Sequence, residues 1–217
     1  MTNMKKMLVT RPNYDKATSY TFYYAGLVIK EAEKKGINVI DLKRPRLTRN
    51  SVTSIIENKE PGLIFFNAHG NEKIIFGDKI NKEPEVLIKE GENHNILNFK
   101  LVYARTCMAA SSLGKKIKGG CFIGYETPFS FWTDKRIDAV PERDKTARLF
   151  FEPSNLIVIS LLKGNTAEEA VKKSANLTKK TILKLLRTKE EGSMALISRL
   201  WNNMEGICIS GNKQMTF

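Results

Sequence analysis

The chain has 217 residues, 41% of them hydrophobic, which is enough to bury a full core, and one compact domain over 1–217 is expected at this size. Its formal net charge of +13 admits an acidic partner such as nucleic acid, because basic domains gain affinity by releasing phosphate counterions. No apolar run approaches the roughly 20 residues of a membrane helix, and the run in MTNMKKMLVT is too short for a secretory signal. We therefore expect a cytoplasmic protein that does not enter the membrane.

The basic charge is spread over the chain. Most of it comes from lysines in stretches such as KEAEKKG and VKKSANLTKK, where glutamates are interleaved. No aromatic and basic RNA motif, zinc finger or recognition helix accompanies it. A solvated basic surface is the favoured interpretation, and a role with nucleic acid or another acidic partner is the alternative.

The cysteine and histidine content argues against disulfides and metals. Three cysteines form an odd number without framework spacing, which suggests reduced thiols. Two histidines without paired spacing to cysteine make a zinc site improbable. No GxGxxG or GxxxxGK[ST] motif follows a strand, so no nucleotide cofactor is expected.

Strand-like and helix-like stretches alternate along the first half of the chain. Short apolar runs predict strands in MKKMLVTRP (4–12), INVIDL (37–42) and PGLIFFNAHG (61–70). Amphipathic stretches predict helices in DKATSYTFYYAGLVIKEAEKKG (15–36) and TRNSVTSIIENKE (48–60). EKIIFGDKI (72–80) predicts a small β excursion, and a polar loop with a surface residue, His94, is expected over 81–100.

The alternation continues through the middle of the chain. LVYARTC (101–107) predicts a strand, MAASSLGKKIKGG (108–120) a short helix stopped by glycines, and CFIGYE (121–126) another strand. Near-continuous apolar runs such as LIFF and CFIG are typical of strands that are buried on both faces. The order predicts an α/β fold, a mostly parallel central sheet with helices on both faces.

The C-terminal third is mainly helical in its periodicity. The stretches are DKTARLFFEPSNLIVISLLKG (144–164), TAEEAVKKSANLTKKTILKLLRTKE (166–190) and SMALISRLWNNMEGICISG (193–211). Thr166 is placed as an N-cap, and Glu169 three residues later completes a capping box. Between CFIGYE and this region, a loop rich in aromatic and charged residues is expected over 126–143.

Two apolar strands end in chemically reactive residues. LIFFNAHG ends in His69 and Gly70, and LVYARTC ends in Cys107. The carboxyl ends of neighbouring parallel strands converge on one crevice, so we expect these residues to meet. A helix that begins after Cys107 would favour its thiolate through the helix dipole. Cys107 is then a candidate nucleophile, His69 its base, and the Gly70 and Cys107 N–H groups an oxyanion hole.

Each of these residues also has a structural interpretation. His69 can be a structural histidine with no role in catalysis. A buried free cysteine is ordinarily inert packing, which is the interpretation of Cys121 and Cys208. The strand-end position distinguishes Cys107 from them.

At these residues the chain resembles the caspase-like cysteine peptidases of clan CD, and it is most similar to their CHAT domains. An apolar strand before His-Gly, and a second one before Cys and small residues, carry the resemblance. GGCFIGYETPF and ARLFFEPSNLIVISLLKGNTAEEAVKKSA extend it over Pro61 to Ala175. The resemblance implies a caspase-like three-layer α/β/α sandwich and a cysteine peptidase with His69 as general base and Cys107 as nucleophile. ARTC replaces the caspase Gln-Ala-Cys-x-Gly signature, so caspase specificity for Asp is not carried over.

The resemblance also implies where specificity lies. In clan CD, the pocket for the residue before the scissile bond is built beside the strand that follows the nucleophile. Glu126 and Asp134 are therefore candidate acidic walls that would select Lys or Arg, and Trp132 and Phe131 are candidate apolar walls. The alternative is that the two carboxylates simply belong to a loop surface.

The expected function is a cysteine endopeptidase that cuts protein or peptide substrates after a basic residue. Peptidases of this clan are often held inactive by a neighbour, so a regulatory protein partner or a ligand is a further expectation. The alternatives are an inactive caspase-like module that binds proteins, and a basic protein associated with nucleic acid.

Overall fold

The structure is a computed structural model that describes residues 4–137, 140–188 and 191–217. Its centre is a six-stranded sheet in the order β2-β1-β3-β6-β7-β8. The strands are β1 (Lys6–Thr10), β2 (Asn38–Leu42), β3 (Leu63–Asn67), β6 (Leu101–Arg105), β7 (Cys121–Tyr125) and β8 (Ile207–Gly211). Neighbours in this order are parallel, except that β8 is antiparallel to β7.

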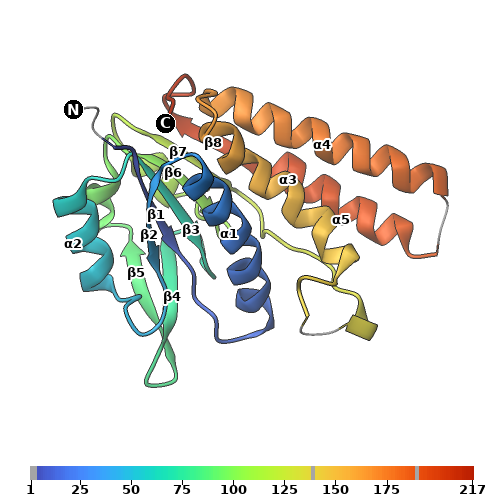
Figure 1. Cartoon of the computed structure of the whole chain (residues 1–217), viewed down its shortest axis with the longest axis horizontal. Helices are drawn as coiled ribbons and strands as arrows, with labels where there is room; N and C mark the ends of the chain where they lie inside the picture. The colour runs from blue at the N-terminus through green and yellow to red at the C-terminus, as the bar shows by residue number, and fades with distance from the viewer. Residues whose placement is uncertain (1–3, 138–139, 189–190) are drawn as a thin grey trace.

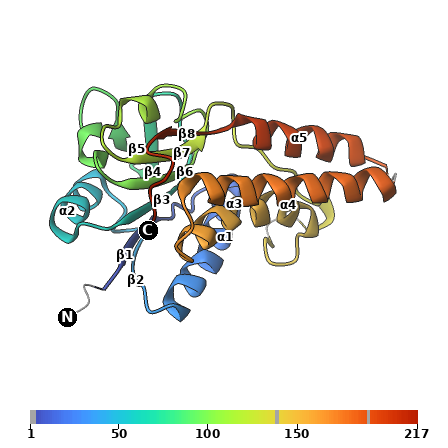
Figure 2. The same cartoon turned by 90° about the horizontal axis from the view of Figure 1, so that it is seen from above.

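Helices and a hairpin cover the two faces of the sheet, as Figures 1 and 2 show. The helices are α1 (Lys16–Lys34), α2 (Arg49–Lys59), α3 (Lys145–Leu161), α4 (Ala167–Thr188) and α5 (Ser193–Gly206), with short 3-10 helices at His94–Leu97, Leu113–Lys116 and Lys135–Ile137. One face packs against α1 and α3, and the other against α2 and the hairpin of β4 (Ile74–Ile80) and β5 (Glu83–Lys89). The predicted α/β class with a three-layer α/β/α arrangement is confirmed.

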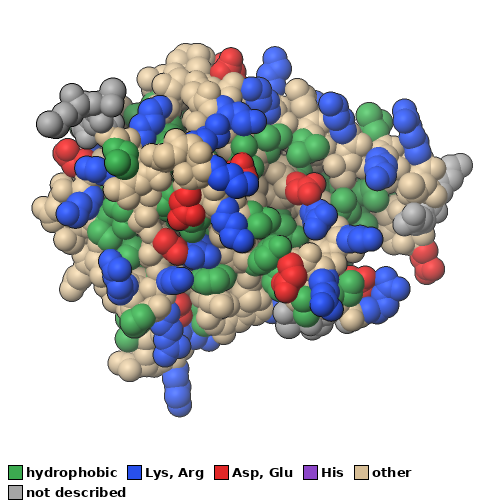
Figure 3. Space-filling view, in the orientation of Figure 1, with side chains coloured by type: hydrophobic (Ala, Val, Ile, Leu, Met, Phe, Trp, Pro, Cys, Tyr) green, Lys and Arg blue, Asp and Glu red, His purple; other side chains and the backbone are tan. Residues whose placement is uncertain are grey.

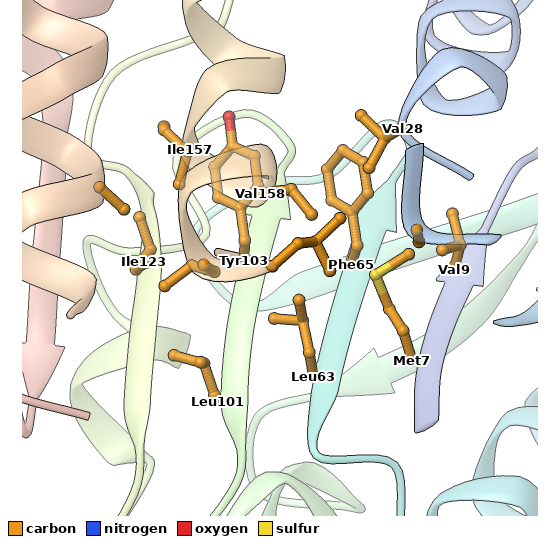
Figure 4. Close-up of a cluster of buried hydrophobic side chains, with 14 of the residues drawn as sticks. Met7, Val9, Val28, Leu63, Phe65, Leu101, Tyr103, Ile123, Ile157 and Val158 are labelled. Atoms are coloured by element: carbon orange, nitrogen blue, oxygen red, sulfur yellow. The ribbon is translucent and has the colours of Figure 1, made fainter. Parts of the chain in front are cut away.

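The core explains why the central strands are apolar throughout. Every residue of β3 and β6 is buried, and alternate side chains enter opposite clusters, so that Phe65 faces α1 and α3 while Phe66 faces α2. Figure 4 shows Phe65 and Tyr103 side by side under Val28 and Val158, with ring centroids 5.2 Å apart. Burying one such side chain contributes roughly 1.5–3 kcal/mol. The strand ends are consequently held on a rigid base.

Capping residues set the helix starts. Asp15 caps α1 in a reciprocal capping box with Thr18. The predicted capping box before α4 is confirmed, because the Glu169 backbone N–H donates to Thr166 Oγ1 at 3.2 Å and the Thr166 N–H donates to the Glu169 carboxylate at 2.9 Å. The last two residues of the helix expected over 166–190 lie outside the described residues. None of the described helices combines the length and apolar character needed to cross a membrane.

The prediction of a helix over 108–120 is wrong. Met108 has a left-handed backbone conformation with φ of 59°, and the turn that follows it is tied to other elements. The Ala110 N–H donates to the Tyr125 carbonyl at 3.1 Å, and the Leu113 N–H to the Glu72 carbonyl at 2.9 Å. Because these groups bond outside the segment, only the 3-10 helix Leu113–Lys116 forms.

The prediction from sequence periodicity did not include two strands of the structure. The segment ICISG, expected as part of a helical tail, forms β8 and pairs with β7 along the edge of the sheet. Five residues of alternating small and branched side chains carry too weak a period to separate strand from helix. The loop expected over 81–100 contains β5, which pairs with the β excursion that was predicted and is now seen as β4.

Candidate active site

A pocket of about 80 Å³ opens where β3 and β6 end, against the first turns of α1. It is lined by Ala17, Thr18, Thr21, Ala68, His69, Arg105, Thr106, Cys107, Phe129 and Phe131. The strand order β2-β1-β3 places the switch point of the sheet between β1 and β3, and ligands of open α/β sheets bind at such points. The pocket contains residues that follow both strands, from α1 after β1 and from the loop after β3. The structure thus brings His69 and Cys107 to one pocket, as the strand-end pattern predicts.

Strand register explains the meeting. Asn67 pairs with Arg105 across β3 and β6, and His69 and Cys107 each lie two residues beyond that pair. A Cβ atom added at Gly70 would lie 3.1 Å from Thr106 Cβ, so the two chain segments approach closely just past the strand ends. A residue larger than glycine would push them apart.

A carboxylate that the sequence interpretation missed completes the pair. The Nε2 atom of His69 lies 2.8 Å from Oδ2 of Asp15, and Oδ1 of the same carboxylate accepts the Thr18 backbone N–H at 2.8 Å. Partial burial would raise the pKa of Asp15, but the hydrogen bonds from Thr18 and His69 outweigh it and lower that pKa below its ordinary value. An ionised carboxylate only accepts, so Nε2 carries the proton and Nδ1 is free to act as a base.

The surroundings of the Cys107 thiol favour its protonated form. Burial raises the pKa of Cys107, and its Sγ atom lies 3.7 Å from the Phe129 carbonyl oxygen as a donor. The helix that was expected to lower this pKa does not form. The prediction that a helix dipole stabilises the thiolate of Cys107 is therefore wrong. Any thiolate must therefore arise by transfer of the proton to a base such as His69.

The backbone N–H groups of Gly70 and Cys107 are the expected donors of an oxyanion hole. Within the described chain, neither the Gly70 N–H nor the Cys107 N–H donates to another residue. Gly70 follows the pocket residue His69, and Cys107 itself lines the pocket. Two unpaired backbone donors beside a thiol are what an oxyanion hole requires.

The expected specificity residues lie elsewhere. Glu126 pairs with Lys115 at 3.0 Å, and Asp134 holds Arg136 at 2.9 Å, whose hydrogen bonds lower the pKa of Asp134 to about 2. Trp132 is 40% exposed and stacks with Arg199. None of these candidate walls lines the pocket that holds Cys107, whereas Phe131 does.

Arg105 is a pocket residue for which the sequence interpretation had no role. It is 1% exposed, and its guanidinium donates to the Asn155 side chain at 2.8 Å and to the Thr21 carbonyl at 3.3 Å. The residue ends β6, two positions before Cys107, so alternation along the strand was the signal that could have placed it in the site.

The described residues contain no group of three or more His, Cys, Asp or Glu side chains that could hold a metal ion. Cys121 is buried in β7, and Cys208 lies partly buried in β8, and neither residue lines the pocket. A comparison with known protein families and with curated proteins found no match to this chain. What the site can do is therefore argued from its geometry.

Proposed function

We propose that the protein is a cysteine endopeptidase, related to the caspase-like clan, in which Cys107 is the nucleophile and His69 the general base. The observation that carries the proposal is the presence of His69 and Cys107 in one pocket, with Asp15 bonded to Nε2 of the imidazole. Nucleophile, base and orienting carboxylate form the arrangement by which a weak nucleophile is activated.

The chemistry follows from these groups. Nδ1 of His69 takes the proton from Cys107, and the thiolate attacks the substrate carbonyl carbon. The Gly70 and Cys107 N–H groups receive the oxyanion of the tetrahedral intermediate. The imidazolium, stabilised by Asp15, then protonates the leaving amine, and a thioester remains on Cys107. Water, deprotonated by His69, attacks the thioester and releases the carboxylic acid and the thiol.

The loop that carries Phe129 and Phe131 closes the pocket. Its Ser130 is clamped by Asn203 of α5, whose Oδ1 accepts the Ser130 N–H at 3.1 Å and whose Nδ2 donates to the Ser130 carbonyl at 2.7 Å. The Phe129 carbonyl of this loop accepts from the Cys107 thiol, so a shift of the loop would change the surroundings of Sγ. A regulatory partner or ligand that moves α5 would release this clamp, which supports activation by binding.

The preference for Lys or Arg is not part of this proposal, because its acidic walls lie outside the pocket. The face shown in Figure 3 does not favour a role in nucleic-acid binding. On the face in Figure 3, Lys and Arg side chains are dispersed, with Asp and Glu between them, whereas a phosphate-binding surface gathers its cations in a patch or stripe.

The test uses the whole chain, a peptide library and a broad peptidyl chloromethyl ketone, which alkylates active-site thiols with loss of chloride. We expect turnover in the parent chain and a ketone adduct that mass spectrometry maps to Cys107, with neither in Cys107→Ala. Cys208→Ala is the matched control, because Cys208 does not line the pocket, and it should behave like the parent. Turnover that survives in Cys107→Ala would overturn the assignment, and an adduct confined to Cys208 would favour the inactive protein-binding module.

A further inference from the structure

One face of α4 carries positive charges that the described chain does not neutralise. The acidic residues of this helix, Glu168 and Glu169, both lie in its first turn. The rest of the helix bears exposed cations, none of which forms an ion pair within the described residues. They are Lys172, Lys179, Lys180, Lys184 and Arg187. This part of α4 thus lacks the carboxylates that lie between the cations on much of the face in Figure 3.

Two exposed leucines lie beside these cations on the same helix. Leu183 is 54% exposed and Leu186 is 46% exposed. Residues three and four positions apart are neighbours along a helix surface, so the side chains fall into rows. We define the α4 stripe as two adjacent rows: Lys179, Leu183 and Leu186 in one, and Lys180, Lys184 and Arg187 in the other.

The stripe is open to a partner because another side of the helix packs against the protein. The buried residues of α4 recur every three or four positions and include Thr178 and Ile182, and Ile182 joins Phe150 and Leu200 in a small apolar cluster. Figures 1 and 2 show α4 and α5 extending away from the central sheet. The half of α4 that holds the stripe is the half farther from the sheet, so a broad surface has access to it.

We propose that the α4 stripe binds the surface of a bilayer that carries anionic lipid headgroups. Lysine and arginine are attracted to the negative headgroups, and leucines enter the boundary between headgroups and acyl chains. A nucleic acid would attract the cations but leave Leu183 and Leu186 in water. A second copy of the chain, with its own net charge of +13, would be repelled. The helix lies along the bilayer, since none of the described helices is long and apolar enough to cross one.

The test measures co-sedimentation of the whole chain with sucrose-loaded vesicles, and it requires no peptidase activity. We expect binding to phosphatidylcholine vesicles that contain about 30% phosphatidylserine, and none to phosphatidylcholine alone. Each cation near such a surface contributes about fivefold to the partition coefficient. The triple variant Lys180→Gln, Lys184→Gln and Arg187→Gln should therefore lower it about a hundredfold. Equal binding to both kinds of vesicle, or undiminished binding of the triple variant, overturns the proposal.

A second variant distinguishes a bilayer from a nucleic acid. Leu183→Gln combined with Leu186→Gln keeps the charge and a residue that favours helix, and it should lower vesicle binding about tenfold through the lost apolar burial. Circular dichroism shows that each variant is folded. Vesicle binding of the leucine variant equal to that of the parent overturns the bilayer proposal. Tighter binding of the parent to a DNA duplex at equal phosphate concentration overturns it as well and assigns the stripe to nucleic acid.

Two matched controls make the same changes at other places. The charge control replaces three exposed lysines outside α4: Lys30→Gln, Lys116→Gln and Lys118→Gln. The apolar control combines Leu27→Gln with Ile80→Gln, at side chains that are 37% and 44% exposed. Each control should bind anionic vesicles more tightly than the stripe variant that it matches. A control that loses as much binding as its stripe variant overturns the assignment to α4.

Discussion

The imidazole of His69 and the carboxylate of Asp15 are joined by a hydrogen bond of 2.8 Å, although 54 residues separate them in sequence. The bond links the loop after β3 to the first turn of α1. It gives Asp15 two tasks, because the same carboxylate caps the helix and orients the base. Substitutions at this position can separate these two tasks.

Replacing Asp15 with Asn should reduce kcat by roughly 10²- to 10⁴-fold with little change in KM, because an amide no longer fixes the tautomer or stabilises the imidazolium. Asn is as good an N-cap as Asp, so α1 should remain folded. Steady-state kinetics as a function of pH check this, and Asp134→Asn, which affects only the exposed pair with Arg136, is the matched control. Equal losses of kcat in both variants would rule out an orienting role.

The lowered pKa of Asp15 also predicts how stability responds to acid. The pKa of Asp15 in the folded state lies below the unfolded value near 3.8. The stabilisation of the fold by the ionised carboxylate is therefore fully present above that value, and it is lost as the pH falls through the folded pKa. The difference in melting temperature between the parent chain and Asp15→Asn should therefore shrink on acidification below about pH 4. A difference in melting temperature that stays constant from pH 6 to pH 2.5 would contradict this prediction.

Loosening the loop over the pocket should make Cys107 more reactive. Asn203→Ala removes both hydrogen bonds to Ser130, and the burial that raises the pKa of Cys107 should decrease with it. Alkylation by iodoacetamide at pH 7.5, followed by peptide mass spectrometry, should show faster labelling of Cys107 relative to Cys208 in the same sample. If the ratio of the two rates is unchanged, the clamp does not control access.

Gly70→Ala should impair turnover more than stability. The added Cβ would lie 2.8 Å from the Ile74 carbonyl oxygen and 3.1 Å from Thr106 Cβ, so the backbone around Gly70 must shift, and we expect its N–H to move with it. Loss of one oxyanion donor costs about 10²- to 10³-fold in kcat. Kinetics and thermal unfolding measured on one preparation separate the two effects, and an undiminished kcat would exclude Gly70 from the oxyanion hole.

The sequence predicts those features that depend on strong local patterns. The apolar run of β3 and the turn of His69 and Gly70 after it fix a strand end, and parallel pairing brings that end to Cys107. The capping box of Thr166 and Glu169 is likewise local. These features need no long-range information beyond the rule that parallel strands end at one edge.

Features that depend on distant contacts could not be predicted in this way. Asp15 is indistinguishable from any helix cap until the fold brings it to His69, and ICISG becomes a strand only because β7 offers an unpaired edge. The carboxylate Glu126 was assigned to the wall of the pocket from its place after a strand, yet its side chain turns to Lys115. The burial of Arg105 likewise depends on distant residues, because its guanidinium donates to Asn155 of α3 and to the Thr21 carbonyl of α1.

The central claim is that Cys107 and His69 act as one catalytic unit, and a double-mutant cycle of peptide hydrolysis tests it most directly. The measurement is kcat/KM on one cleaved peptide for the parent, Cys107→Ala, His69→Ala and the double variant. Because residues that act as a unit are each needed in full, each single variant should lose several orders of magnitude and the double variant no more than either. Turnover retained in Cys107→Ala, or losses that multiply in the double variant, would contradict the account.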